Sequence, residues 1–381
     1  MNKTATTYIS LGSNMGDRLN HLQDAVFHIN TRIGKVTRLS HVYETPAWGF
    51  DGDYFYNACI EVKTEYWPQE VLKRLLQIEV RLGRERNTGP GYTARTIDLD
   101  ILYYDREILH SEILTIPHPN LTKRRFVLKP LADIAPQFYH PEVNKDTRNL
   151  LQECKDKSDI QRTPHKLYAN RLALFSQLHF ISIEGNIGAG KTTLANRIGN
   201  DFNAKLILER FADNPFLPKF YEDQGRFAFP LEMSFLADRY QQFMDDTSQY
   251  DLFKNFMVSD YDIHKSLIFA KVTLREEEFK LYRKLFGLMY KEVQRPKVYI
   301  YLYQNTDRLI RNIRQRGRSY EQKIESAYLE KINQGYLDYI KSFPEQHNLV
   351  IDISKMDFVE NPNDYELILD IIQKFVVKLS L

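Results

Sequence analysis

A glycine-rich segment in the middle of the chain, Gly185-Asn186-Ile187-Gly188-Ala189-Gly190-Lys191-Thr192, matches the pattern G-x-x-x-x-G-K-[ST] at every position. Its glycines let consecutive backbone N–H groups curl around a polyphosphate, and the next helix adds the positive end of its dipole. The apolar residues 180–184 predict the strand before the loop, and residues 193–200 predict the helix after it. Because such a loop normally follows the first strand of its domain, a nucleotide-handling domain begins near residue 178 and another domain precedes it.

The composition excludes several classes of protein. A length of 381 residues predicts two or three domains, and a hydrophobic content of 43% supports a core in each. The net charge of +2 gives no reason to expect nucleic-acid or membrane binding. Two distant cysteines, Cys59 and Cys154, make neither a disulfide framework nor a zinc motif. Without a signal peptide or an apolar run of membrane-spanning length, we expect a cytoplasmic protein.

The first half alternates strands and helices. The spacing of apolar residues predicts strands over 7–11, 56–64 and 97–104, and helices over 18–32 and 68–82, which is typical of an α+β domain. Residues 144–165 are polar and charged, and we expect a final helix and a linker there. The predicted boundaries are a first domain over residues 1–160, a linker over 161–177 and a second domain over 178–381.

The second half predicts an α/β domain with a parallel sheet and many helices. Further strands are expected over 205–208, 297–303 and 349–354, where apolar residues run without alternation, as in buried parallel strands. The two halves are not copies of each other.

Two aspartates stand two positions apart in the clearest strand of the first half. Since side chains alternate along a strand, Asp98 and Asp100 point to one face while Leu99 points to the core. Paired carboxylates repel each other and suit Mg²⁺, which prefers one or two carboxylates plus substrate phosphates. An ordinary solvated strand face is the alternative. The nearby basic residues favour a triphosphate site: Arg84, Arg86, Arg95 and residues 123–125.

With these residues, about 5–155 of the chain resembles 6-hydroxymethyl-7,8-dihydropterin pyrophosphokinase, a family of folate synthesis. The matching segments are Leu11-Gly12-Ser13-Asn14, Tyr43-Glu44-Thr45-Pro46, Phe55-Tyr56-Asn57-Ala58, Gly83-Arg84-Glu85-Arg86, residues 95–100, Ile116-Pro117-His118 and residues 124–131. The resemblance implies a ferredoxin-like fold, with two Mg²⁺ ions held by Asp98 and Asp100. It implies pterin contacts by Thr45, Phe55, Asn57 and Phe126, and phosphate contacts by Arg84, Arg95, His118 and Arg124.

Physical chemistry agrees with the implied pterin contacts. Two aromatic faces hold a flat heterocycle, each contributing roughly 1–3 kcal/mol, and an asparagine amide offers donor and acceptor together. Simple core packing of Phe55 and Phe126 is the alternative. Two positions depart from the family: Phe55 stands where tyrosine is frequent, and Ile113 replaces a phosphate-binding arginine of some members. We expect weaker ATP contact at the second position.

The phosphate loop alone allows a GTPase, an ATPase or a kinase. The guanine motif N-K-x-D is absent, which disfavours a GTPase. Glu209 ends the predicted strand 205–208, where a carboxylate beside the phosphates can act as the base for a substrate hydroxyl. A surface glutamate is the alternative.

Arginines recur on one predicted helix of the second half. Arg308, Arg311 and Arg314 share a helical stripe, and Arg316 and Arg318 flank a glycine at its end. The pattern fits a lid that neutralises a transferring phosphoryl group. A solvated basic face or a nucleic-acid patch are the alternatives.

These features resemble the deoxyribonucleoside kinases over about residues 178–378. The matching segments are residues 184–193, Glu209, Asn214-Pro215-Phe216-Leu217, Phe220-Tyr221, Phe235-Leu236, Arg239, Ile268-Phe269-Ala270, Arg316-Gly317-Arg318, Glu321 and Tyr328-Leu329. The resemblance implies a P-loop kinase fold with Glu209 as general base and Arg316 and Arg318 as lid arginines. It implies that Tyr221 and Glu321 hold the 3′-hydroxyl and that Arg239 lies beside the base. We expect Gly185 through Thr193 to bind the phosphates and Mg²⁺. Lys191 would contact the outer phosphates, and Thr192 would ligate the metal.

Two positions depart from the kinase family. Glu232 stands where many members use glutamine to bind the base. Ser259-Asp260-Tyr261 replaces an acidic-Arg-Ser motif, so it keeps an acid that can help bind Mg²⁺ but lacks the arginine. The sequence does not identify what replaces that arginine.

We therefore expect a bifunctional transferase. The first domain transfers pyrophosphate from ATP to the hydroxymethyl-dihydropterin, and the second phosphorylates deoxynucleosides, preferably purine ones, at the 5′-hydroxyl. Both need Mg²⁺ and ATP, and the kinase family implies a homodimer. The alternatives are an active pyrophosphokinase with a degenerate binding or dimerisation P-loop domain, and nucleic-acid binding through the arginine stripe. The preferred deoxynucleoside and the donor triphosphate of the kinase half stay open.

Overall fold

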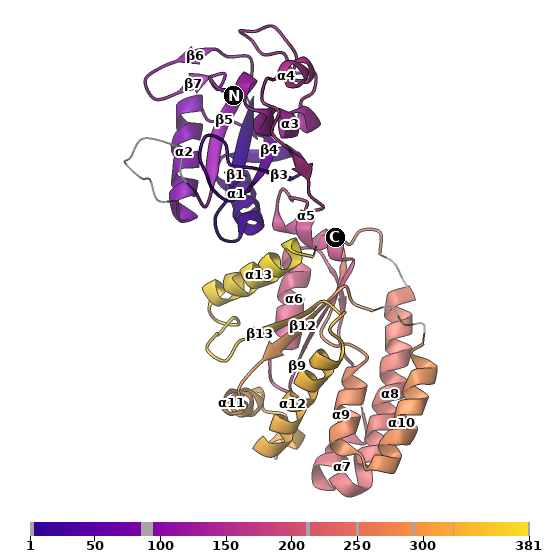
Figure 1. Ribbon diagram of the computed structural model, residues 1–381. Coiled ribbons are helices and arrows are strands. Elements are labelled where there is room, and N and C mark those ends of the chain that lie inside the picture. The colour runs from indigo at the N-terminus through magenta and orange to yellow at the C-terminus, as the bar shows by residue number, and fades with distance from the viewer. Residues whose placement is uncertain are drawn as a thin grey trace. The chain divides into compact units, whose positions relative to one another are not determined.

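The computed structural model describes residues 4–84, 94–210, 214–248, 251–291, 293, 295–322 and 324–379. By its contacts the chain divides into two compact units, Met1–Leu174 with Gln373–Leu381, and Phe175–Ile372. Figure 1 shows a sheet with helices in each unit.

The first unit is built on an antiparallel sheet. Its strand order is β5 (Asp98–Tyr104), β1 (Ala5–Ser13), β4 (Phe55–Thr64), β3 (Tyr43–Thr45) and β8 (Gln161–Arg162), with β2 (Gly34–Leu39) also paired to β4. A separate hairpin joins β6 (Leu109–His110) to β7 (Thr115–Ile116). The sequence predicted β1, β4 and β5. It did not predict β2 and β3, and β8 lies inside the segment expected to be linker.

Helices cover both faces of this sheet. The helices α1 (Arg18–Arg32) and α2 (Pro68–Arg81) have the predicted starting residues, and they pack against β1, β4 and β5. Asp17 caps α1 through a hydrogen bond from the N–H of Asn20, and Pro68 opens α2 without losing an intrahelical bond. The helices α3 (Arg125–Ile134) and α4 (Thr147–Glu153) cover the other face.

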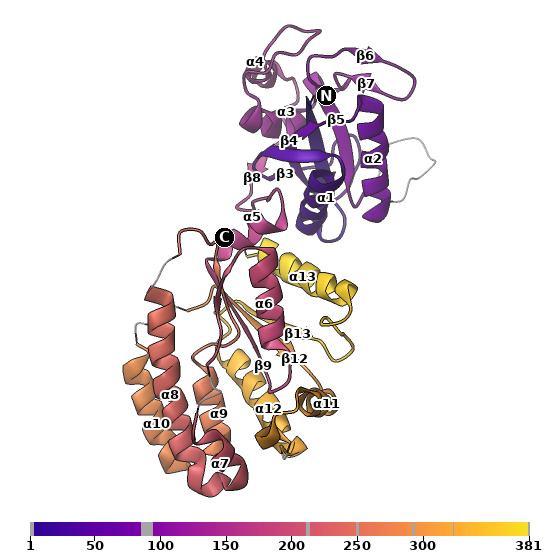
Figure 2. The same ribbon diagram turned by 180° about the vertical axis from the view of Figure 1, so that it is seen from behind.

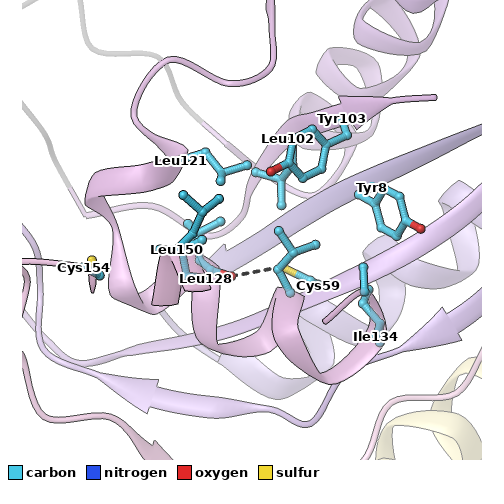
Figure 3. Close-up of a cluster of buried hydrophobic side chains, with 12 residues drawn as sticks. Tyr8, Cys59, Leu102, Tyr103, Leu121, Leu128, Ile134, Leu150 and Cys154 are labelled. Carbon is cyan, nitrogen blue, oxygen red and sulfur yellow. Dashed lines mark hydrogen bonds between the residues drawn. The ribbon is translucent and has the colours of Figure 1, made fainter. Parts of the chain in front are cut away.

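A hydrophobic core lies between the sheet and the helices α3 and α4. Figure 3 shows Tyr8 and Cys59 of the sheet packed among Leu121, Leu128 and Leu150. The Cys59 thiol donates to the carbonyl of Val127, 3.7 Å away. Cys59 and Cys154 are both buried and free.

The second unit contains a parallel sheet of the order β10 (Lys205–Ile207), β11 (Met257–Ser259), β9 (Phe180–Gly185), β12 (Val298–Tyr303) and β13 (Asn348–Asp352). Four strands were predicted within a few residues. The strand β11 was not predicted. Because all five strands are parallel, their carboxyl ends share one edge. The glycine-rich loop, Glu209 and Asp260 all follow strands at that edge.

The helices of the second unit lie on both faces of the sheet. Figures 1 and 2 show α6 (Lys191–Asp201) beside α13 (Pro362–Val377), where Tyr365 donates to Asp201. The helices α8, α9, α10 and α12 pack against the other face through aromatic clusters. The remaining bounds are α5 (Arg171–Phe175), α7 (Leu217–Glu222), α8 (Gln224–Ser248), α9 (Lys265–Thr273), α10 (Glu276–Met289), α11 (Thr306–Arg316) and α12 (Ser326–Ser342). No described helix combines the length and apolar character needed to cross a membrane.

Candidate active sites

A row of three residues crosses the sheet of the first unit. Gly12 in β1 pairs with Asp98 of β5 on one side and with Asn57 of β4 on the other. A Cβ on Gly12 would lie 3.0 Å from Asn57 Oδ1 and 3.7 Å from a Phe55 ring carbon. A side chain at this position would therefore crowd Asn57, so the absence of a Cβ keeps the Asn57 amide accessible from the β1 side.

Aromatic and polar side chains line a cavity of about 50 Å³ beside this row. Thr45, Phe55, Asn57 and Phe126, the four predicted pterin contacts, all belong to its wall, together with Asp98 and Asp100. The buried Asn57 amide donates to Thr45 Oγ1 over 2.8 Å. Trp48 and Phe50 complete the wall, with ring centroids 6.2 Å from those of Phe126 and Phe55 respectively.

Two of the predicted phosphate-binding arginines contact the aspartate pair directly. Asp98 accepts hydrogen bonds from Arg84 Nη1 and from Arg95 Nη1, each over 2.6 Å. Arg84 also pairs with the buried Glu79, which accepts the backbone N–H of Leu99. Arg95 lines the cavity, and Arg84 contacts the same Asp98 carboxylate.

The other two predicted phosphate ligands lie near Asp100. His118 Nε2 and Arg124 Nη1 are 3.9 Å and 3.8 Å from Asp100 Oδ2. Burial and the charge of Arg124 lower the pKa of His118 to about 4, so its ring is neutral near pH 7. Burial and the charge of Asp98 raise the pKa of Asp100.

The aspartate pair fits a hard divalent cation. Asp98 and Asp100 project from alternate positions of β5 into the same cavity, and neighbouring carboxylates that repel each other are stabilised by a cation. Within the described ranges no three His, Cys, Asp or Glu side chains converge on one point. Two carboxylates completed by substrate oxygens match the coordination that Mg²⁺ prefers. Arg86 lies outside the described residues.

The second unit holds a cavity of about 670 Å³ at the carboxyl edge of its sheet. Its wall includes the predicted residues Ile187, Gly188, Ala189, Gly190, Lys191, Thr192, Thr193, Glu209, Tyr221, Glu232, Arg239, Asp260, Arg316, Arg318 and Glu321. Residues distant in sequence thus converge on one site of a size typical for small-molecule ligands.

Hydrogen bonds hold the glycine-rich loop in shape. Gly188 and Gly190 have φ angles of +82° and +84°, which other residues rarely adopt. The Asn186 amide, inside the protein, donates to the Leu329 carbonyl and to Asn333. Lys191 Nζ donates to the Asn186 carbonyl over 3.0 Å, and the Thr192 hydroxyl donates to Asp260. A hydroxyl and a carboxylate side by side at the loop fit a magnesium ion beside phosphates.

Glu209 lies between two cations, and its side chain is only 10% exposed, which rules out the surface alternative. Lys265 Nζ lies 2.6 Å from its Oε2 atom, and Arg239 Nη2 lies 2.8 Å from its Oε1 atom. Its backbone N–H donates to Asp260 over 2.8 Å. Burial alone would raise the pKa of Glu209, but the charges of Lys265 and Arg239 outweigh burial, so that pKa lies well below its usual range. The carboxylate is therefore ionised.

The wall of the same cavity carries the remaining predicted contacts. Glu232 is buried, and its Oε1 atom accepts the Thr273 hydroxyl over 3.0 Å. Glu321 pairs with Arg316 and, over 3.3 Å, with Arg318. Tyr221 stacks on Tyr320 with a centroid separation of 6.2 Å. Of the predicted arginine stripe, Arg308 lines the cavity, whereas Arg311 and Arg314 are exposed.

Comparison with known proteins decides the families. The family 7,8-dihydro-6-hydroxymethylpterin-pyrophosphokinase matches residues 8–136, and the family deoxynucleoside kinase matches residues 181–377. The pyrophosphokinase of Porphyromonas gingivalis is 42% identical over 142 residues, covering 36% of this chain and 96% of that protein. Deoxyguanosine kinase of Bacillus subtilis is 39% identical over 203 residues, covering 52% of this chain and 98% of that protein. The chain belongs to both families.

A solved structure of deoxyadenosine kinase from M. mycoides is also similar to the second unit. It is 24% identical, has a TM-score of 0.45 and covers 51% of this chain and 99% of that one. The two predicted fold classes are confirmed: an antiparallel α+β pyrophosphokinase unit and a deoxynucleoside kinase unit with a parallel five-stranded sheet.

Some residues of these sites were not predicted from sequence. Trp48 and Phe50 could have been found from the aromatic pair that follows Pro46. Glu79 carries no such signal, since it occupies an ordinary helical position in α2 and meets Arg84 only through the fold. The sequence motifs did not predict a role for Lys265 either. It lies five positions after Asp260, at the start of α9, and contacts Glu209 only through the fold.

Proposed function

We propose that the pyrophosphokinase unit transfers the β,γ-pyrophosphoryl group of ATP to the hydroxymethyl group of a 6-hydroxymethyl-7,8-dihydropterin. The observation that carries the proposal is the row Asp98, Gly12 and Asn57, with the four pterin contacts on one cavity wall. Thr45 and Asn57 would bind the polar edge of the pterin, and Phe55 and Phe126 would pack on its faces. The bond from the hydroxymethyl oxygen to the β-phosphorus forms as the bond from that phosphorus to the bridging oxygen breaks. AMP leaves with the bridging oxygen, and the hydroxyl proton is released to water.

Charge neutralisation is the main task of the other residues in this site. Asp98 and Asp100 would hold Mg²⁺, which on binding would neutralise phosphate charge and orient the triphosphate. Arg84, Arg95 and Arg124 would exchange their carboxylate partners for phosphate oxygens, since a guanidinium fork fits either anion. Neutral His118 would donate a hydrogen bond to phosphate without adding charge.

Analysis of the adenine nucleotide tests this function. The purified chain is incubated with ATP, Mg²⁺ and the hydroxymethyl-dihydropterin, and we expect AMP in a one-to-one ratio with pterin pyrophosphate. Formation of ADP, or no nucleotide conversion, would contradict the proposal.

We propose that the kinase unit transfers the γ-phosphoryl group of ATP to the 5′-hydroxyl of a purine deoxynucleoside. The ionised Glu209 beside the phosphate-binding loop carries this proposal, because a carboxylate there can accept the hydroxyl proton as the O5′–phosphorus bond forms. Lys191 would bind the outer phosphates, with Mg²⁺ held by Thr192 and Asp260. Arg316 and Arg318 would close on the phosphoryl group, and Tyr221 and Glu321 would bind the 3′-hydroxyl.

Glu232 favours guanine within this proposal. Its Oε2 atom is buried at the cavity wall and has no hydrogen-bond partner among the described residues, and burial raises the pKa of the carboxyl to about 7. Guanine presents N1–H and an exocyclic amine, two donors that a carboxylate accepts, whereas adenine presents an acceptor at N1 that an ionised carboxylate repels. The relative from Bacillus subtilis is named a deoxyguanosine kinase, which supports the same preference.

Competition between purines tests the preference. We expect the wild type to have a higher kcat/KM for deoxyguanosine than for deoxyadenosine at pH 8. Glu232→Gln, whose amide offers one donor and one acceptor, should shift that ratio toward deoxyadenosine by about 10–100-fold. An unchanged ratio would remove Glu232 from base recognition, and turnover of pyrimidine deoxynucleosides alone would contradict the purine proposal.

We also propose that two copies pair through the kinase unit. Leu281 and Leu288, seven positions apart on α10, are 50% and 78% exposed, and Met244 on α8 is also exposed. Apolar side chains on one helical face suit a second copy of the same helices. Light scattering should give about twice the monomer mass, and Leu288→Glu should reduce it to that of the monomer.

A further inference from the structure

The kinase site contains a lysine, Lys265, that belongs to none of the predicted motifs. Lys265 is the first residue of α9, and its side chain is only 8% exposed. Its Nζ atom donates to Glu209 Oε2 over 2.6 Å, while Arg239 Nε donates to Glu209 Oε1 over 2.9 Å. Each oxygen of the carboxylate is thus bonded to a different cation.

Burial makes this lysine unusual. A buried ammonium is unfavourable unless a carboxylate pairs with it, and a second ammonium nearby makes it more so. Lys191 lies in the same cavity, and burial together with the charge of Lys265 lowers the pKa of Lys191. The site therefore contains two ammonium groups in one cavity. Because this arrangement is unfavourable, it indicates that Lys265 has a function there.

The segment Ser259-Asp260-Tyr261 supplies no cation to Glu209. Both oxygens of Asp260 accept hydrogen bonds, one from the Thr192 hydroxyl and one from the backbone N–H of Glu209. The Ser259 hydroxyl donates to the carbonyl of Tyr261, and the Tyr261 ring is part of the core. Another residue must hold the Oε2 side of the carboxylate.

We propose that Lys265 is the positioning residue for Glu209, and that it fills the place of the arginine absent from Ser259-Asp260-Tyr261. Its ammonium fixes the Oε2 atom while Arg239 fixes Oε1, so that the carboxylate cannot rotate away from the 5′-hydroxyl. Each carboxylate oxygen keeps a lone pair for the substrate. The inference rests on the proposed kinase function.

The proposed role leaves Lys265 outside the bond changes. The proton of the 5′-hydroxyl passes to Glu209 as the O5′–phosphorus bond forms and the bond from the γ-phosphorus to the bridging oxygen of ADP breaks. Lys265 only donates a hydrogen bond to Glu209 and takes no part in the proton transfer. Its removal should therefore affect turnover more than substrate binding, because misplacement of a base by about 1 Å reduces the rate strongly.

Substitutions at two lysines of α9 test the role. Lys265→Met should lower kcat for deoxynucleoside phosphorylation about 10–1,000-fold and leave the KM of the nucleoside within a few-fold. Lys265→Arg should recover most of that turnover, since a guanidinium can donate to the same oxygen. Lys271→Met, an exposed position on the same helix, is the matched control and should behave as wild type. Pyrophosphokinase activity and calorimetric nucleoside binding by the same protein report on folding.

A double-mutant cycle separates action through Glu209 from a general structural effect. In a Glu209→Gln background, Lys265→Met should cause almost no further loss of kcat, because both act on one step. Equal losses in both backgrounds would overturn the inference, as would wild-type turnover in Lys265→Met or an effect confined to the KM of ATP. A wild-type chain inactive on every deoxynucleoside would instead contradict the proposed function itself.

Discussion

Arg95 Nη1 lies 2.6 Å from Asp98 Oδ2, so an arginine implied to bind phosphate is held by a carboxylate implied to bind metal. Arg84 contacts the other oxygen of the same carboxylate at the same distance. The proposed metal ligand and two of the proposed phosphate ligands therefore contact each other directly. A metal ion bound to Asp98 would compete with both guanidinium groups for this carboxylate.

Loss of either aspartate should abolish only the pterin reaction. Asp98→Ala or Asp100→Ala removes half of the proposed metal site, and we expect AMP formation with the pterin to fall at least about 10³-fold. Deoxynucleoside phosphorylation by the same protein is the internal control and should stay at wild-type rates. Equal loss of both activities would contradict independent sites.

A methyl group at Gly12 should block the pterin pocket. The Cβ of Gly12→Ala would stand 3.0 Å from Asn57 Oδ1, tighter than most real contacts, and 3.7 Å from a Phe55 ring carbon. We expect the KM of the pterin to rise by about tenfold or more, with little change in the KM of ATP. Pterin binding measured by fluorescence checks this prediction. An unchanged affinity would show that the pterin does not bind beside Gly12.

Glu209→Gln should lower kcat of the kinase reaction by about 10²–10⁴-fold with little change in nucleoside affinity. The amide keeps the size of the side chain but cannot take the hydroxyl proton. Steady-state kinetics with calorimetric binding makes the measurement. Near-normal turnover of the Glu209→Gln variant would show that Glu209 is not the base.

Arg318→Ala should mainly lower turnover of the kinase unit. Arg318 lines the cavity and pairs with Glu321 over 3.3 Å, so it stands where a lid can close on phosphates. We expect a loss of about 10-fold or more in kcat. An effect seen only in DNA or RNA binding, measured by filter retention, would favour the nucleic-acid alternative.

Glu232 should make stability depend on pH. The unfolded carboxyl loses its proton near its usual pKa of about 4.5, whereas the folded one keeps it to about 7. The folded state then binds more protons between these values, so the free energy of unfolding falls as pH rises through this window. Relative to Glu232→Gln, the wild type should lose on the order of 3 kcal/mol between pH 4.5 and pH 8. Denaturant unfolding of both proteins measures the difference, and parallel pH profiles would contradict it.

Local pattern was enough for the elements with strong periodicity. The bounds of α1 and the pairing of Asp98 with Asp100 on one strand face follow from spacing alone, and the structure agrees. The short strands β3 and β8 escaped prediction because two or three residues carry no period, and only pairing with a neighbour makes them strands.

The sequence by itself determined the two families, the phosphate-binding loop and the aspartate pair. The residues that identify each of these features form short motifs along the chain. The tertiary structure decided which distant groups meet: Gly12 between Asp98 and Asn57, Glu79 beneath Arg84, and Lys265 against Glu209. Such contacts depend on strand register and on where a helix begins relative to a sheet. A buried charged group needs a partner of opposite charge, and that partner can come from a distant segment of the chain. Local sequence spacing does not indicate such pairs.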